Sequence, residues 1–134
     1  MKLGDIGDTP LVEVKSDSGN RVFSKCEFMN PSGSHKDRTY LSIITKLEAS
    51  GVIQPGMILV DSSTGNGGAA LAWIGREKGY SIRIFMPEGM TQERKAQILS
   101  YGAQITETPK EEFLAGAATM AQKFSSEALE GNTY

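Results

Sequence analysis

The chain has 134 residues, of which 39% are hydrophobic and 22% charged, values typical of a globular domain rather than a disordered or collagen-like chain. Its formal net charge is -2 and it contains no basic block, so we expect no nucleic-acid partner. Cys26 is the single cysteine, which excludes a disulfide within these residues and favours a reducing compartment. No run of about 18 uncharged apolar residues occurs, and the opening lacks the apolar core of a signal peptide. We therefore expect a soluble, cytoplasmic protein without a membrane span.

Apolar, β-branched runs alternate along the chain with segments of helical spacing. The runs predict strands at residues 22–28, 57–63, 81–87 and 103–109. Apolar residues at three- and four-residue steps predict helices around Leu41–Leu47, Leu71–Ile74, Ile98–Leu99 and Phe113–Phe124. Alternating strands and helices are typical of parallel strands joined by crossovers. The expected fold class is α/β: one three-layer domain over residues 1–134, with a parallel sheet of about four strands flanked by helices.

Two further segments mark the boundaries of these elements. Thr108-Pro109-Lys110-Glu111 combines an N-cap threonine, a proline at the first helical position and a glutamate three residues after the cap, which predicts a helix start. We expect that helix to end near Leu129. The opening residues 6–14, IGDTPLVEV, predict a short strand or arm, and Pro10 argues against a central position in a sheet.

The stretch NPSGSHKDR (30–38) lies between a predicted strand and a predicted helix. Ser34, with Asp37 three residues later, can cap that helix, which places Lys36 in its first turn. The helix dipole disfavours a cation there by roughly 0.3 to 1 kcal/mol. Two interpretations follow: Lys36 extends to water, or its uncharged amine serves as the nucleophile that forms a Schiff base.

A second unusual loop is DSSTGNGGAALAW (61–73), which follows a predicted strand and opens an alanine-rich helix. Its hydroxyl residues and glycines let a ligand approach the free N–H groups of the helix start, an arrangement that binds anions. The same glycines are also compatible with a simple turn of the chain. The loop matches neither the dinucleotide fingerprint nor the lysine-bearing phosphate loop.

Together, these stretches resemble the tryptophan-synthase-β-like enzymes that use pyridoxal phosphate (fold type II), a group that includes cysteine synthase, cystathionine β-synthase and threonine synthase. EFMNPSGSHKDR (27–38) is similar to the segment around the cofactor lysine of that family. GDTPL (7–11) is similar to its opening, and SSTGNGG (62–68) to its loop for the substrate carboxylate. The residues of the first stretch that match are Glu27, Asn30, Pro31, Gly33, Ser34, Lys36, Asp37 and Arg38.

The resemblance implies a role for particular residues. Lys36 would hold pyridoxal 5'-phosphate covalently and later move the α-proton of the substrate. Asn30 would support the lysine segment at the cofactor, and Asn66 would lie near the ring oxygen of the cofactor. None of these roles needs a metal. The substrate carboxylate would be bound by Ser63, Thr64, Gly65 and Asn66.

The implied activity is β-replacement or β-elimination on a small amino acid, such as O-acetylserine or a related hydroxyamino-acid derivative. Cysteine synthases usually read TSGNTG in the carboxylate loop, whereas residues 63–68 read STGNGG. The STGN portion is closer to threonine synthase, so a threonine synthase-like or threonine dehydratase-like enzyme is an alternative. His35 stands where cysteine synthases often have an apolar residue, and we assign it no role.

The family's enzymes are longer, with a second, larger domain that carries a glycine-rich loop for the cofactor phosphate. The sole Gly-Gly pair here is Gly67-Gly68, in the other loop. We therefore expect residues 1–134 to be the smaller domain, with weak cofactor binding alone and a need for a complementary C-terminal domain or a homo-oligomer.

Two hypotheses outside this enzyme family stay open. The first is a non-catalytic module that binds a partner or an amino-acid-like anion. The second is a small nucleotide- or phosphate-binding domain that uses Gly65 to Gly68. That domain needs a charged partner after the next strand, and Glu88 is the only candidate.

Overall fold

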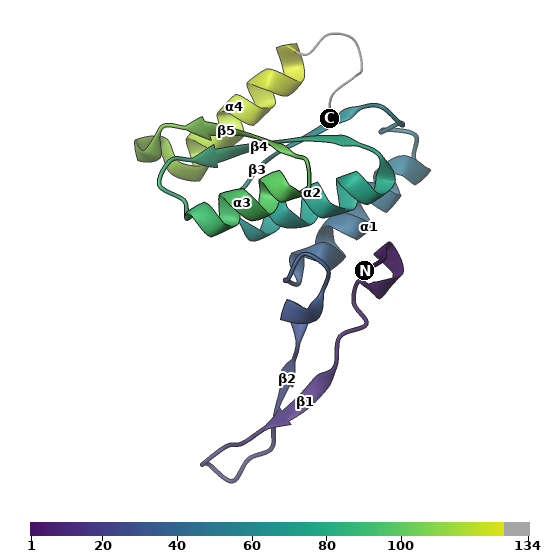
Figure 1. Cartoon of the computed structure of the whole chain (residues 1–134), viewed down its shortest axis with the longest axis vertical. Helices are drawn as coiled ribbons and strands as arrows, with labels where there is room; N and C mark the ends of the chain where they lie inside the picture. The colour runs from purple at the N-terminus through teal and green to yellow at the C-terminus, as the bar shows by residue number, and fades with distance from the viewer. Residues whose placement is uncertain (128–134) are drawn as a thin grey trace.

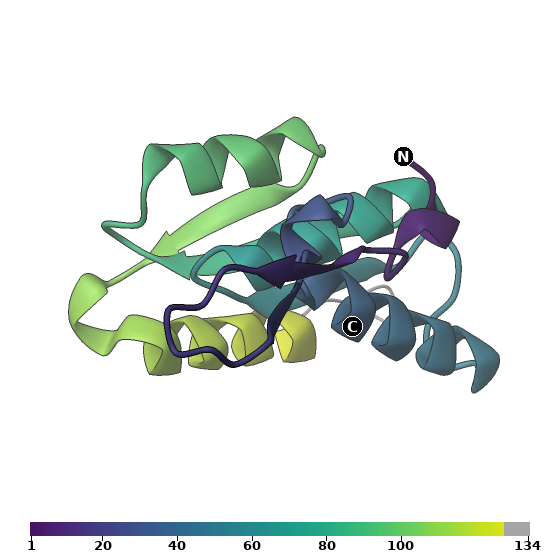
Figure 2. The same cartoon turned by 90° about the horizontal axis from the view of Figure 1, so that it is seen from below.

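The computed structural model describes residues 1–127, and it has a three-layer body with a projecting hairpin (Figure 1). The sheet of the body is parallel and has the strand order β3-β4-β5. Helices α2 and α3 pack on one face and α4 on the other, while α1 packs against α2 (Figure 2). The strands are β3 (Ile58–Ser62), β4 (Ser81–Pro87) and β5 (Gln104–Thr108). The helices are α1 (Lys36–Ala49), α2 (Asn66–Lys78), α3 (Gln92–Ser100) and α4 (Phe113–Glu127).

The core lies on both faces of β4, the central strand. Its residues Ile84, Phe85 and Met86 are all buried, as expected for a strand covered on each side. Toward α2, the glycine at position 75 allows close packing, because a Cβ there would lie 2.3 Å from Ile82 Cδ1. Toward α4, the rings of Phe85 and Phe124 have centroids 5.8 Å apart. Within residues 1–127, no helix is both long enough and apolar enough to cross a bilayer.

The α/β class and the parallel sheet were predicted from the sequence, but one predicted strand lies elsewhere. Residues Val22–Lys25 form β2, which pairs antiparallel with β1 (Leu11–Val14) rather than joining the parallel sheet. Residues 15–21 connect β1 to β2, a loop that can close a hairpin but is too short for the crossover of a dozen or more residues that a parallel pair needs. The hairpin extends away from the body and is exposed along both strands (Figure 1). The parallel sheet therefore contains three of the four predicted strands.

The start of α4 differs from the prediction. Thr108 is not an N-cap: it is the last residue of β5, it is buried, and its hydroxyl has no hydrogen-bond partner in the part of the chain that the structure describes. The sheet engages its backbone instead, because Thr108 pairs with Pro87 and its carbonyl accepts a hydrogen bond from the Glu88 N–H at 2.9 Å. A short 3-10 turn over Lys110–Glu112 follows before α4 begins. The predicted helix end near Leu129 lies outside the described residues.

Candidate functional site

A hollow of about 390 Å³ opens where β3 ends and helices α1 and α2 begin. Ligands of parallel α/β sheets gather at this edge, beyond the carboxyl ends of the strands. The hollow brings Lys36 next to residues 62–67, which come more than twenty positions later in the sequence. Among the described residues, its lining contains cations and hydroxyl groups but no carboxylate, so it suits an anion. The lining residues are Lys36, Tyr40, Ser62, Ser63, Thr64, Asn66, Gly67, Arg94 and Leu114.

Lys36 is the first residue of α1 and is partly buried. This confirms its predicted place in the first turn of that helix. Among the residues that the structure describes, its ammonium group has neither a hydrogen-bond acceptor nor an ion-pair partner. An amine without a carboxylate partner, at the wall of a hollow, is accessible for covalent chemistry.

The predicted cap of α1 was partly wrong. His35, which is exposed, occupies the N-cap position, and the Ser34 hydroxyl accepts a hydrogen bond from the Lys36 N–H at 3.2 Å. Asp37 is fully buried, and its carboxylate turns back to accept from the Ser32 N–H at 2.7 Å and from the Ser32 hydroxyl. A buried carboxylate needs such donors, and the turn before the helix supplies them. Asp37 therefore fixes the turn that precedes Lys36 rather than the helix start.

Asn30 holds the same turn from inside. It is buried, and its side-chain NH₂ donates to the Ser34 carbonyl at 3.0 Å, to the Glu27 carbonyl at 3.0 Å and to the Glu27 carboxylate at 2.8 Å. Its side-chain oxygen accepts from the Gly7 N–H at 2.8 Å. Asn30 does not line the hollow that contains Lys36. The structure thus places it as a support of the lysine segment, while contact with a cofactor stays a prediction.

Glu27 and Arg38 extend this support to the start of the chain. The guanidinium of Arg38 donates through Nε and Nη2 to the Glu27 carboxylate, at 2.9 and 2.8 Å, and through Nη2 to the Gly7 carbonyl at 2.8 Å. The Thr9 hydroxyl also donates to Glu27, at 2.8 Å. These bonds, with that of Arg38 first, lower the pKa of the Glu27 carboxyl to about 2. The GDTP segment, the turn and the first turn of α1 are therefore tied together.

The predicted carboxylate loop lies at the start of α2. Ser63 is buried, and its hydroxyl oxygen accepts from the N–H groups of Gly65, at 3.2 Å, and of Gly68, at 2.8 Å. In the first turn of a helix, N–H groups such as those of Asn66 and Gly67 have no intrahelical acceptor. Together with the positive end of the helix dipole, they form a site for an anion. The structure brings together Ser63, Thr64 and Asn66 at the hollow, and Gly65 at the N-cap just behind it.

Two side chains of the lining were missed by the sequence reasoning. Arg94, from the first turns of α3, donates through Nη1 to the Thr64 carbonyl at 3.2 Å. Tyr40 lies one helical turn after Lys36, and its hydroxyl donates to the Asp61 carboxylate at the end of β3. The spacing of four residues from Lys36 indicates that Tyr40 shares its helix face, a signal that was available. Nothing in the spacing of Arg94 indicated its position, because the sheet brings α3 to this loop.

Electrostatics hold Tyr40 in its protonated form. Burial, with the nearby charge of Asp61 adding to it, raises the pKa of the Tyr40 hydroxyl. Burial also raises the pKa of the Asp61 carboxyl, against the opposing effect of the Tyr40 hydrogen bond. At neutral pH the phenol is therefore a hydrogen-bond donor, and the Asp61 carboxylate accepts its hydrogen bond.

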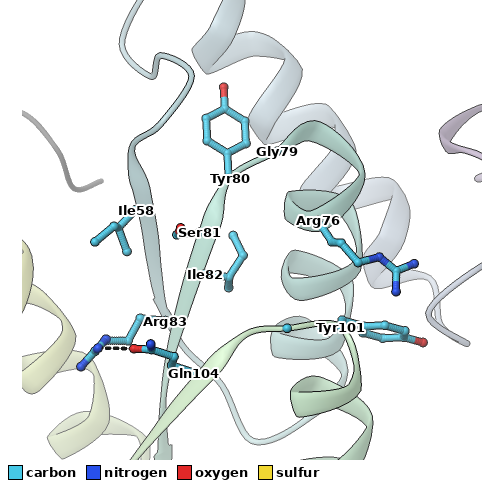
Figure 3. Close-up of a pocket in the computed structure, with 10 residues that line it drawn as sticks. Ile58, Arg76, Gly79, Tyr80, Ser81, Ile82, Arg83, Tyr101 and Gln104 are labelled. Carbon is cyan, nitrogen blue, oxygen red and sulfur yellow. Dashed lines mark hydrogen bonds between the residues drawn. The ribbon is translucent and has the colours of Figure 1, made fainter.

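A larger hollow of about 510 Å³ lies at the opposite end of the strands (Figure 3). Its two arginines point away from each other: Arg76 extends toward the ring of Tyr101, 5.2 Å from the centroid, and Arg83 donates to Gln104 (Figure 3). None of the described residues that line it is a lysine, a cysteine or a carboxylate. Within residues 1–127, no group of three or more potential ligands is placed to bind a metal ion. The reactive groups are thus gathered at the carboxyl ends of the strands.

Comparison with known proteins identifies relatives over nearly the whole chain. Residues 2–134 match the family described as "Pyridoxal-phosphate dependent enzyme". Cysteine synthase B of Escherichia coli (strain K12) is 44% identical over 119 residues, which are 87% of this chain and 39% of that protein. The chain therefore spans about two fifths of the length of that curated relative.

Solved structures give the same result. Cysteine synthase from Entamoeba histolytica superimposes with a TM-score of 0.89 and 33% identity, over 98% of this chain and 41% of that one. A hydrogen sulfide-producing enzyme from Fusobacterium nucleatum superimposes with a TM-score of 0.91 and 30% identity, over 98% of this chain and 44% of that one. The body and the hairpin are thus similar to a part of these longer proteins.

Proposed function

Because the chain belongs to the family of pyridoxal-phosphate dependent enzymes, we propose that it carries the cofactor lysine and the substrate-carboxylate loop of an enzyme for β-replacement or β-elimination. The proposed substrate is a small hydroxyamino-acid derivative such as O-acetylserine. One observation carries this proposal: the Lys36 amine, which has no partner among the described residues, lines the same hollow as the anion-binding start of α2.

The hollow suits both the cofactor and an amino acid. It offers an amine for an aldehyde and N–H and hydroxyl donors for a carboxylate, and within residues 1–127 no carboxylate lines it to repel either. Pyridoxal phosphate, when bound, supplies an electron-withdrawing ring that stabilises negative charge at the α-carbon of an amino acid. The residues of this chain therefore have to bind, orient and move protons.

Several residues of the hollow take these tasks in the proposal. Lys36 holds the cofactor covalently and, once displaced, moves the proton at the α-carbon of the substrate. The hydroxyl groups of Ser63 and Thr64, with the N–H groups at Asn66 and Gly67, bind the substrate carboxylate. Asn66 would also help to hold the cofactor when it is bound.

Further residues support these tasks from outside the carboxylate loop. Arg94 adds positive charge and holds the Thr64 carbonyl. Asn30 positions the segment that carries Lys36. Neither residue needs to touch the reacting atoms for this purpose.

Residues 1–134 form the smaller domain of the enzyme in this proposal. The activity as a whole needs a grip on the cofactor phosphate and a partner for the ring nitrogen, which we place on a complementary C-terminal domain. The chain's span of about two fifths of the E. coli relative supports this division.

A threonine synthase-like or threonine dehydratase-like activity is the second candidate. The order of residues in the STGN portion (63–66) supports it. With a complementary C-terminal polypeptide present, product analysis on O-acetylserine with sulfide, on O-phosphohomoserine and on threonine separates the two. Cysteine or pyruvate formed from O-acetylserine favours the first activity, and threonine formed from O-phosphohomoserine or 2-oxobutanoate formed from threonine favours the second.

The test of the cofactor site is the absorbance spectrum after pyridoxal phosphate is added, alone and with the complementary polypeptide. We expect an absorbance band at the short-wavelength edge of the visible range. This band is lost in Lys36→Ala and kept in the matched variant Lys46→Ala, which changes an exposed lysine of the same helix. An unchanged band in Lys36→Ala would contradict the proposal. Thermal stabilisation by amino acids without any cofactor would instead favour a non-catalytic binding module.

A further inference from the structure

Tyr40 is a second titratable side chain of the hollow that the proposed chemistry does not use. It lies on α1, four residues after Lys36, so both side chains are on the same face of the helix. Tyr40 lines the hollow together with Lys36 and the loop at the start of α2. Its hydroxyl is fixed by the hydrogen bond to Asp61 at the end of β3. The ring is therefore fixed in the hollow that also contains Lys36 and the carboxylate loop.

Gly67 is the residue of the loop that meets this ring. A Cβ at position 67 would lie 2.9 Å from the Tyr40 hydroxyl oxygen, 3.1 Å from Ser63 Oγ and 3.4 Å from a ring carbon of Tyr40. The backbone of Gly67 does not need glycine, because it is absent from the positive-φ positions of the chain. The contact with Tyr40 and Ser63 is thus what makes a side chain unfavourable at position 67.

The geometry points to Tyr40 as a specificity-determining residue of the hollow. Its ring occupies the space that a side chain at position 67 would take, and so forms the wall of the hollow beside the carboxylate loop. This wall limits the group that can bind beside Lys36 to a small carboxylate compound. The inference rests on the proposed function, because it takes Lys36 as the reactive amine and the start of α2 as the carboxylate site.

The steric conflict between Tyr40 and a side chain at position 67 is tested by a double-mutant cycle on thermal stability, with no ligand present. Gly67→Ala lowers the melting temperature of the parent chain, because the new methyl group meets the Tyr40 hydroxyl. In a Tyr40→Phe background, Gly67→Ala lowers the melting temperature less or raises it, because the nearest oxygen is gone and alanine favours the helix. Equal shifts in the two backgrounds would overturn the claim that Tyr40 and a side chain at position 67 share one space.

The size limit is tested with two carboxylate aldehydes, glyoxylate and the bulkier 4-carboxybenzaldehyde. A lysine amine adds to the aldehyde carbon and water leaves, which gives a C=N bond. Borohydride then delivers hydride to that carbon and the nitrogen takes a proton from solvent, which gives a stable secondary amine. Peptide mass mapping quantifies the adduct on Lys36, normalised to the adduct on Lys15, an exposed lysine of the same chain.

We expect Lys36 of the parent chain to favour glyoxylate, and Tyr40→Ala to raise the share of the bulky adduct several-fold. Tyr40→Phe keeps the parent ratio, because the ring remains. If circular dichroism shows that Tyr40→Ala is unfolded, Tyr40→Leu takes its place and gives a smaller rise.

Two negative outcomes have different meanings. A ratio that is unchanged by loss of the ring, while glyoxylate still labels Lys36, would overturn the role of Tyr40 and leave the proposed function in place. If glyoxylate labels Lys36 of the parent chain no more than it labels Lys15, the proposed function is overturned, and the size limit with it.

Discussion

The two loops that meet at the hollow are held in different ways. In the lysine loop, residues 30–38, the side chains of Asn30, Asp37 and Arg38 bind backbone and side-chain groups of the turn or of the start of the chain. In the carboxylate loop, residues 62–68, the Ser63 hydroxyl caps the helix and Arg94 holds one carbonyl, while first-turn N–H groups stay without an intrahelical acceptor.

This difference matches what each loop has to do. A lysine that reacts at one position needs a segment whose polar groups are already satisfied, because such a network fixes a single conformation. A loop that binds an anion needs donors that are not yet used. Variants that disturb the lysine loop should therefore lower the free energy of unfolding by a different amount from variants that disturb the carboxylate loop.

The largest effect is expected in the lysine loop. Asn30→Ala removes four hydrogen bonds and leaves the Gly7 N–H and the Ser34 carbonyl without that partner. With roughly 1 to 3 kcal/mol for each buried group left unsatisfied, we expect a loss of about 2 to 4 kcal/mol in the free energy of unfolding. Urea unfolding measures it, with Asn20→Ala at the exposed hairpin turn as the control. A loss as small as that of Asn20→Ala would show that the network does not hold the loop.

A smaller loss is expected in the carboxylate loop. Ser63→Ala leaves the Gly68 N–H without its cap and should cost about 1 kcal/mol, the usual value for a lost helix cap. The matched control is Ser126→Ala, an exposed serine of α4. If Ser63→Ala destabilised the chain more than Asn30→Ala, the contrast between the two loops would be reversed.

Thr108 lies outside both loops, and its buried hydroxyl has no hydrogen-bond partner among the described residues. Since this buried hydroxyl has no partner, Thr108→Val should raise the free energy of unfolding by up to about 1 kcal/mol. Thr39→Val, at an exposed position of α1, serves as the control. Destabilisation by Thr108→Val would mean that this hydroxyl makes a stabilising contact after all.

The smallest effect is the pH dependence that Glu27 gives to the lysine loop. Its pKa is lowered from 4.5 to about 2 in the folded chain, so its stabilising contribution is present above pH 4.5 and is lost as pH falls toward 2. The stability difference between the parent and Glu27→Gln should therefore be constant from pH 7 to about 5 and shrink below that. Denaturant unfolding at several pH values measures it, and a constant difference down to about pH 2 would contradict it.

Local patterns predicted most of the fold. The strands of the parallel sheet and the four helices follow from apolar spacing, which is set by the sequence itself. The place of residues 22–25 could not be read this way, because strand pairing depends on which partner the chain brings near. Thr108 was misjudged for a related reason: pairing with β4 outweighed its preference for a helix cap.

The site was predicted to a similar degree. Lys36, Ser63, Thr64 and Asn66 were named from sequence, and the structure places them at one hollow. Tyr40 was not named, although its spacing of four residues from Lys36 indicated a shared helix face. Arg94 was not named because it reaches the hollow through packing between elements rather than through a motif. Asn30 was named as a support of the lysine segment at the cofactor, and its hydrogen bonds show how it supports that segment.

The central claim is that Lys36 is the amine of this hollow that reacts with the cofactor aldehyde. The most direct test is addition of pyridoxal phosphate, borohydride reduction and peptide mass mapping of every lysine, with and without a complementary C-terminal polypeptide. The account predicts a reduced pyridoxyl adduct on Lys36 well above exposed lysines such as Lys15 and Lys46. An adduct spread over the exposed lysines, or concentrated on another residue even with that polypeptide present, would contradict it.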